Sequence, residues 1–305
     1  MTCHKFVQMN YQNTIARPVE TEGVGLHTAV RGHLRLAPAP ADTGIVFRRT
    51  DLENFEIEAQ GRWLARVSYA TSLMKKGVLL STVEHVLAAL YACGIDNVYV
   101  ELDALEIPIL DGSSRPFVEM IAQAGIRRLR RRRRYLKLVR PVEISDGERQ
   151  ISAIPADRFH VRYFIDFPHP MVGREEIELD VDAESFTRVL APARTFGFLD
   201  DVSRLRSMDL IRGGSLDNAI VLTRDGLLSG ELRFPDEFAR HKALDLIGDI
   251  ALVGRPLLAS VTAHKGGHAL HTALVTRLLK DRSLTIETDE PVVAPADDLR
   301  VAVGD

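Results

Sequence analysis

Apolar residues recur along this chain at two spacings, one typical of β-strands and one typical of α-helices. In the first half they predict strands at 32–36 and 44–47, a helix at 81–93, a strand at 97–102 and a helix at 114–124. In the second half they predict strands at 135–144, 150–154 and 160–167, then a helix at 236–253, a strand at 257–262 and a helix at 267–279. Both halves therefore run through strands, a helix, a strand and a second helix.

This shared order predicts an α+β fold of two similar domains, each with a sheet layered against a helix pair. No sequence identity links the two halves, so the prediction depends on the pattern alone. We expect an N-terminal domain over 1–128, a basic junction over 129–135 and a C-terminal domain over 136–285. A segment near 191–215 has the character of an insertion in the second domain, and 286–305 is expected to be a loose tail.

The bulk properties are those of an ordinary soluble globular protein: of 305 residues, 46% are hydrophobic and 27% are charged. The formal net charge of -3 argues against a protein whose whole surface is devoted to nucleic acid. The two cysteines, Cys3 and Cys93, suggest no disulfide framework, which fits a reducing compartment. The first residues lack the apolar core of a signal peptide, and the longest apolar run, 86–95, is too short to span a bilayer. We expect a cytoplasmic protein.

The strongest local signal for chemistry is a polar stripe on the predicted helix 236–253. His241, Asp245 and Asp249 follow one another at positions i, i+4 and i+8, so their side chains lie on one face. A His and an Asp one turn apart can bind one metal ion, because both side chains reach the same strip of the helix surface. The same spacing fits an ordinary amphipathic helix, and the stripe on its own does not decide between the two interpretations.

A second candidate pair, Glu84 and His85, lies near the start of the predicted helix 81–93. Adjacent helical residues point about 100° apart, so His85 could bind a metal while Glu84 reaches water beside it. On local evidence alone, a capping box in which Glu84 bonds the Ser81 amide is the favoured interpretation. However, His85 and His241 both lie on the first helix of their domain's pair, so a domain interface could bring them together. Two histidines and one carboxylate would then form a zinc site open to water.

Two further residues could take part in catalysis. His268 follows two glycines at the start of the last predicted helix, where a lone His is usually incidental and the helix dipole disfavours its charged form. A nearby carboxylate such as Asp249 would reverse that effect and hold an imidazolium able to protonate a leaving amine. The hydroxyl of Thr195 could stabilise an oxyanion, although threonine beside glycine is also a common turn residue.

Eight short motifs resemble, in order, those of the UDP-3-O-acyl-N-acetylglucosamine deacetylase family over nearly the whole chain. They are VGLHT at 24–28, STVEH at 81–85, GIDN at 94–97, EIPILDGS at 106–113, RTFGF at 194–198, GGS at 213–215, FARHKALDLIGD at 238–249 and GHAL at 267–270. Because so many motifs match in the right order, the resemblance is highly specific.

This resemblance implies a zinc-dependent amide hydrolase that removes the 2-acetamido group of UDP-3-O-acyl-N-acetylglucosamine as acetate, the committed step of lipid A biosynthesis. It implies that His85, His241 and Asp245 bind one Zn²⁺ ion. It also implies an insert in each domain, an active site between the domains and an apolar passage for the acyl chain in the second insert. The apolar residues available there are Phe196, Phe198, Leu199, Val202, Leu205, Met208, Leu210 and Ile211.

The resemblance assigns the remaining catalytic roles as well. It implies that Glu84 is the general base and that His268 is the cation that protonates the leaving amine. Thr195 would stabilise the oxyanion, Lys242 would support the substrate and Asp249 would support His268. The chain departs from the family's usual residues at Ala29 (usually Gly), at Gly266 (commonly Ser) and at His271 (commonly Asn).

A rival interpretation is a nucleic-acid or anionic-membrane binding protein that acts through an arginine-rich run. The run lacks interleaved aromatic residues and a recognised binding motif, and such a binder has no use for the histidines and carboxylates above. We expect a solvated junction, no nucleic acid, at most a peripheral membrane contact, a monomer, and a UDP-linked acylated amino sugar as substrate. The run comprises Arg127, Arg128, Arg130, Arg131, Arg132, Arg133 and Arg134.

Overall fold

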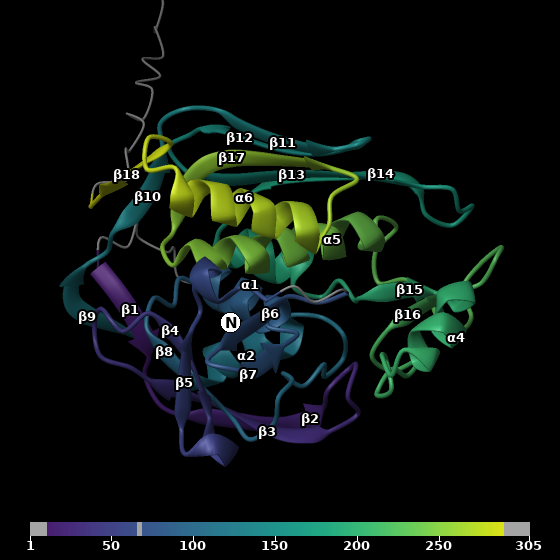
Figure 1. Cartoon of the computed structure of the whole chain (residues 1–305), viewed down its shortest axis with the longest axis horizontal. Coiled ribbons are helices and arrows are strands. Elements are labelled where there is room, and N and C mark those ends of the chain that lie inside the picture. Colours follow the sequence, from purple (N-terminus) through teal and green to yellow (C-terminus); the bar gives the residue numbers. More distant parts are fainter. Residues whose placement is uncertain (1–10, 66–68, 290–305) are drawn as a thin grey trace, which may run out of the picture.

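The computed structural model describes residues 11–65 and 69–289, whose two largest sheets have helices between them (Figure 1). The first sheet has the strand order β2-β3-β8-β4-β5. Its strands are β2 Val19–Val24, β3 Arg31–Pro38, β4 Ile45–Arg49, β5 Phe55–Glu58 and β8 Val98–Leu102. The second sheet is built around β17 Leu257–His264, which is flanked by β11 Val142–Asp146, β12 Arg149–Pro155, β13 Phe159–Phe167 and β14 Gly173–Asp180.

Five strands of the second sheet repeat the topology of the first. In each, an antiparallel hairpin (β2 and β3, or β11 and β12) pairs antiparallel with a central strand, β8 or β17. On its other side the central strand pairs in parallel with β4 or β13, which continues into an antiparallel outer strand, β5 or β14. Parallel neighbours require a crossover connection, and a helix lies within each one. The predicted α+β fold is therefore confirmed, and nothing in the strand order conflicts with the predicted pair of similar units.

Four helices fill the space between the sheets: α1 Glu84–Ala92, α2 Arg115–Ala124, α5 Glu237–Ile250 and α6 His268–Lys280. The pair α1 and α2 lies beside the first sheet and the pair α5 and α6 beside the second (Figure 1). α1 and α5 pack against each other at the centre. In α1 every residue except Tyr91 is buried, because a helix enclosed by other elements on all sides has no face left for solvent.

Each unit carries an insert ahead of its first helix. In the first unit it is the hairpin of β6 Ser72–Lys75 and β7 Val78–Ser81. In the second unit it contains β15 Phe196–Phe198, α4 Leu199–Ser207 and β16 Ile220–Leu222, so it extends beyond the predicted limit at 215. Short helices complete the connections: η1 Thr50–Leu52, η2 Gly61–Trp63, α3 Ala183–Ser185, η3 Phe186–Leu190 and η4 Ala251–Val253. Within the described residues, no helix combines the length and apolar character needed to cross a bilayer.

The junction and the tail differ from the sequence prediction. β9 Ile126–Arg132 pairs antiparallel with β1 Tyr11–Ile15, so most of the predicted basic junction is an ordered strand. β18 Thr285–Thr288 pairs with β10 Tyr135–Leu138, and residues 286–288 therefore belong to the second sheet. The remainder of the predicted tail, 290–305, lies outside the described residues, as does Cys3; Cys93 is buried and unbonded.

Candidate active site

The two central helices approach each other closely at one glycine. Gly248 of α5 lies against the main chain of Glu84 at the start of α1, where a Cβ atom would overlap the Glu84 carbonyl oxygen. Glycine has no Cβ, so the helices meet here without a clash. The first turn of α1 and the middle of α5 therefore face one shared, buried region.

Three candidate metal ligands meet in this region, His85 from α1 and His241 and Asp245 from α5. The Nε2 atoms of His85 and His241 lie 3.6 Å and 3.4 Å from the same Asp245 oxygen, Oδ1. One potential ligand atom from each residue lies within 4.8 Å of the others, and all three side chains are buried. The structure thus brings together, across the interface of the two units, the three residues that the sequence singled out as a metal set.

The protonation states of this set suit a metal cation. Burial lowers the pKa of His241 to about 3, so its ring is neutral, and Nδ1 lies 3.1 Å from the Ala193 carbonyl oxygen, which leaves Nε2 free. Burial alone would raise the pKa of Asp245, but the Lys242 ammonium, 2.8 Å from Oδ2, holds that pKa well below its ordinary value. Neutral imidazole and ionised carboxylate are the forms that bind metals, and a set of two nitrogens and one oxygen suits zinc.

Glu84 does not cap the helix that it begins. α1 starts at Glu84 without a side-chain cap, and the Ser81 amide donates its hydrogen bond to the Leu105 carbonyl instead. The Glu84 carboxylate accepts the Thr71 amide at 3.1 Å, and its Oε1 lies 3.8 Å from His268 Nε2. Burial raises the pKa of Glu84 above its ordinary value. The capping-box interpretation is therefore wrong, because the amide it needs is already bonded elsewhere.

His268, the first residue of α6, is held by Asp249 of α5. Its Nδ1 lies 2.8 Å from Asp249 Oδ2. Burial alone would lower the pKa of His268, but the attraction of the Asp249 carboxylate outweighs it and raises the pKa to about 9. The imidazole is therefore protonated at neutral pH, although its place at a helix N-terminus disfavours that form. For Asp249, burial would raise the pKa, but the His268 charge holds it below its ordinary value.

Three residues that the sequence assigned no role complete this cluster. The Thr71 hydroxyl donates a hydrogen bond to Asp249 Oδ1, and His271 Nδ1 lies 2.8 Å from Asp249 Oδ2. Tyr163 of β13 places its hydroxyl 3.0 Å from His271 Nε2. No local pattern marks Thr71 or Tyr163, and His271 was visible only as a departure from the family's usual Asn.

The three candidate ligands, together with Glu84, Lys242 and His268, line a cavity of about 950 Å³ that extends into the second insert, whereas Asp249 lies buried behind His268. Thr195 lines it too, and its hydroxyl forms no hydrogen bond with any residue that the structure describes. Met208, by contrast, is 54% exposed. Six of the eight apolar side chains named from the sequence line the cavity: Phe196, Phe198, Leu199, Val202, Leu205 and Ile211.

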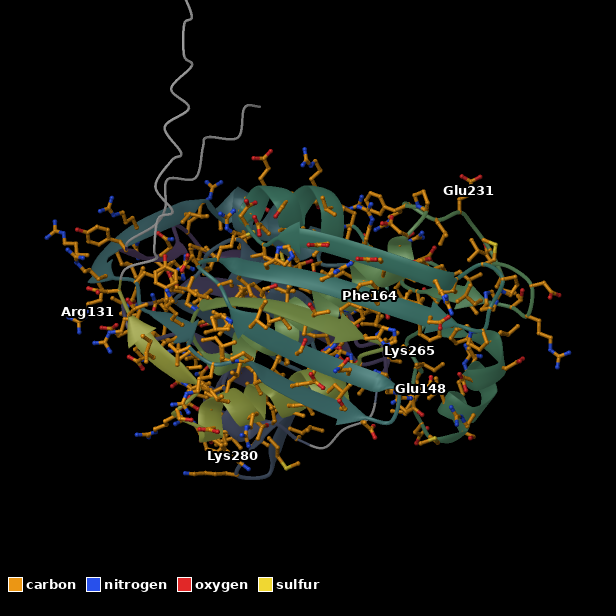
Figure 2. The ribbon with its side chains drawn as sticks, turned by 90° about the horizontal axis from the view of Figure 1, so that it is seen from above. Arg131, Glu148, Phe164, Glu231, Lys265 and Lys280 are labelled. Atoms are coloured by element: carbon orange, nitrogen blue, oxygen red, sulfur yellow. The ribbon has the colours of Figure 1, made fainter. Side chains whose placement is uncertain are left out.

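No arginine of the arginine-rich run lines this cavity. Seen from above, Arg131 is at one end of the molecule and Glu231, in the segment that leads to α5, is near the other (Figure 2). Arg133 is largely buried, with Nε 2.7 Å from Asp96 Oδ1, which differs from the expected solvated junction. Neighbouring arginines also pair with carboxylates: Arg131 with Asp42, Arg132 with Asp289 and Arg134 with Glu287.

A buried His-His-Asp set beside a carboxylate and an imidazolium has the features of a metallohydrolase, and comparison with known proteins gives the family. A family model described as UDP-3-O-acyl N-acetylglycosamine deacetylase matches residues 12–280. The UDP-3-O-acyl-N-acetylglucosamine deacetylase of Solibacter usitatus is 54% identical over 277 residues, which cover 90% of this chain and 94% of that protein. Proteins with the same name from Anaeromyxobacter sp. and Myxococcus xanthus are 48% and 46% identical, over 93% and 89% of this chain and 95% and 87% of their own. The chain therefore belongs to the UDP-3-O-acyl N-acetylglycosamine deacetylase family.

Proposed function

We propose that this protein hydrolyses the 2-acetamido group of UDP-3-O-acyl-N-acetylglucosamine to the free amine and acetate, the committed step of lipid A biosynthesis. Membership of the family supports the reaction. The observation that carries the proposal is the convergence of the candidate ligand set with Glu84 and His268 at the wall of one apolar cavity. The substrate would be a UDP-linked acylated amino sugar, and the enzyme would act as a monomer with at most a peripheral membrane contact.

The metal that fits the site is a single Zn²⁺ ion held by His85, His241 and Asp245. When bound, such an ion acts as a Lewis acid for the acetamide carbonyl and lowers the pKa of water. The protein prepares the site in advance: the Ala193 carbonyl directs the His241 ring, and Lys242 keeps Asp245 ionised by pairing with its second oxygen. Three protein ligands leave a position free for water or substrate.

Glu84 and His268 divide the proton transfers between them. Glu84 accepts a proton from the attacking water, and its raised pKa makes it a stronger base than an exposed glutamate. The water oxygen bonds to the carbonyl carbon, and the Thr195 hydroxyl is free to donate to the carbonyl oxygen as negative charge develops there. The C–N bond then breaks, and protonated His268 gives its proton to the departing nitrogen. Asp249 keeps His268 charged until that step.

The apolar part of the cavity supplies a binding site for the 3-O-acyl chain. Each methylene that it removes from water contributes about 0.8 kcal/mol, so even a partly enclosed chain supplies several kcal/mol. Binding energy from this distant part of the substrate can hold the acetamide against the catalytic groups, so it contributes to kcat/KM and not only to affinity. An acylated sugar should therefore react much faster than the same sugar without its acyl chain.

The test pairs metal analysis with acetate release on one preparation. The purified protein should hold about one zinc ion per chain and release acetate from the acylated substrate, and His241→Ala should lose both. Wild-type zinc content in a His85→Ala, His241→Ala double variant would refute the proposed ligand set. Zinc-loaded protein that releases no acetate would refute the proposed reaction.

A further inference from the structure

Gly266 and His271 both lie against one buried group, the hydroxyl of Tyr163. A Cβ atom at Gly266 would lie 2.8 Å from that hydroxyl oxygen and 3.2 Å from His271 Nε2. A larger residue such as serine would bring its Cβ into this crowded position. Gly266 therefore leaves the room that the pairing of Tyr163 with His271 requires.

The directions of the hydrogen bonds follow from the protonation states. Tyr163 is fully buried, which raises its pKa well above the ordinary value, so it keeps its proton and donates it to His271 Nε2 at 3.0 Å. Burial lowers the pKa of His271, so its ring is neutral and carries its one proton on Nδ1. That N–H donates to Asp249 Oδ2 at 2.8 Å. The ionised Asp249 carboxylate can only accept, so it fixes this tautomer of His271, and the Tyr163 hydroxyl that donates to Nε2 reinforces it.

His271 limits the rotation of the Asp249 carboxylate, because it bonds the same oxygen that bonds His268. Oδ2 accepts hydrogen bonds from both His268 Nδ1 and His271 Nδ1, each at 2.8 Å, while Oδ1 accepts the Thr71 hydroxyl. Asp249 and His271 are fully buried, so no water competes for these positions. With both oxygens bonded, the carboxylate cannot rotate away from His268.

We propose that His271, oriented by Tyr163 in the space that Gly266 leaves, is a positioning residue that fixes Asp249 against His268. It acts through Asp249 and touches no reacting atom. This role rests on the proposed function, because it matters for turnover only if His268 serves as the acid there. A buried hydrogen-bonded pair could instead contribute to folding alone, so the experiment has to separate stability from turnover.

Steady-state kinetics, zinc content and melting temperature, measured on five variants, separate an effect on turnover from an effect on stability. Tyr163→Phe and His271→Asn should each lower kcat about tenfold or more with little change in KM or zinc content, as is usual for residues that support a catalytic group. Gly266→Ser should also lower kcat. The further decrease in kcat that Gly266→Ser causes in a His271→Asn background should be smaller, because the smaller Asn side chain lets Tyr163 move aside. The matched control is His264→Asn, an exposed histidine of β17, which should keep wild-type kcat.

The tautomer of His271 gives a readout that does not depend on activity. In ¹⁵N spectra of histidine-labelled wild-type protein, His271 should show a protonated Nδ1 and an unprotonated Nε2, and Tyr163→Phe should shift the Nε2 signal because it removes the hydrogen bond to that nitrogen. A protonated Nε2 in the wild type would overturn the proposal. So would wild-type kcat in both Tyr163→Phe and His271→Asn, even if melting temperature falls, since that result describes a purely structural pair. Absence of acetate release from the wild type would instead refute the proposed function.

Discussion

Gly248 of α5 lies directly against the main chain of Glu84 in α1, and this contact sets the distance between the two halves of the candidate metal site. Gly248→Ala should force the helices apart, lower the free energy of unfolding by about 1–3 kcal/mol and weaken zinc binding, because His85 moves away from its partners on α5. Denaturant unfolding and a zinc competition titration measure the two effects. Gly226→Ala is the control, since a Cβ there meets no atom within 4 Å. Normal zinc affinity in Gly248→Ala would show that the helix contact does not govern the site.

Glu84→Gln distinguishes a role of Glu84 as the general base from a role as a metal ligand. Glutamine keeps the shape of the side chain but cannot accept the proton, so turnover should fall about a hundredfold or more while zinc content stays at the wild-type level. The melting temperature should change little, because Glu84 caps no helix. Rate, metal content and melting temperature are measured on one preparation. A loss of zinc together with activity would instead assign Glu84 to the ligands.

In the metal-free protein, His268 should titrate near pH 9. Its folded-state pKa is raised to about 9, above the unfolded value of about 6.5. The stabilisation that His268 contributes is therefore fully present below about pH 6.5 and is lost as pH rises through about 9. Histidine NMR titration gives the pKa, and denaturant unfolding between these pH values gives the stability. His268→Gln should lose this pH dependence, and Asp249→Asn should lower the pKa of His268; a wild-type pKa below 6.5 would contradict the assignment.

The acyl-binding role of the second insert is tested by introducing a charged residue either on its cavity-lining side or on its solvent-exposed side. Val202 of α4 lines the cavity, whereas Met208, just beyond the end of α4, is exposed. Val202→Asp should reduce kcat/KM for the acylated substrate by at least tenfold, because several kcal/mol of apolar contact are disturbed, and should leave the slow reaction of the unacylated sugar unchanged. Met208→Asp is the control and should leave both rates near wild type. Equal kcat/KM for acylated and unacylated sugars in the wild-type enzyme would refute the lipid A assignment.

The arginines of the run should differ in how much they contribute to stability: one is structural, and several are solvated. Arg133→Ser leaves the Asp96 carboxylate buried without its partner and should cost about 3 kcal/mol in the free energy of unfolding. Arg130 is exposed, so Arg130→Ser should change that free energy by less than about 0.5 kcal/mol. Urea unfolding compares the two variants. Salt-sensitive, sub-micromolar DNA or RNA binding that is lost on replacing Arg127, Arg128 and Arg130 would support the rival function instead.

Several elements were predictable because their signal lies within a few neighbouring residues. The helical spacing of apolar residues located α5 and α6 to within a few positions, and alternation located β13 and β17. The predicted strand 135–144 is in fact two strands, β10 and β11, with Pro141 in the break between them. β14 was missed because its exposed positions are charged and its other face, which is only half-buried, carries just two large apolar residues, Ile177 and Leu179. β9 and β18 were missed because each gains its order from a partner strand far away in the sequence.

The sequence by itself determined which side chains share a helix face. His241, Asp245 and Asp249 had to lie together, because the period of the α-helix decides that wherever the helix packs. The resemblance to a known family then singled out the partners on the other helices.

The tertiary structure alone decided what surrounds each group. In the folded protein Glu84 does not cap α1, and Lys242 pairs with Asp245. Thr71 and His271 bond Asp249, and Tyr163 bonds His271. The tertiary structure also made His241 neutral and His268 cationic, although both are histidines that line the same cavity. The physical reason is that a pKa depends on burial and on charges a few ångströms away. Those charges come from elements whose positions no local pattern in the sequence records.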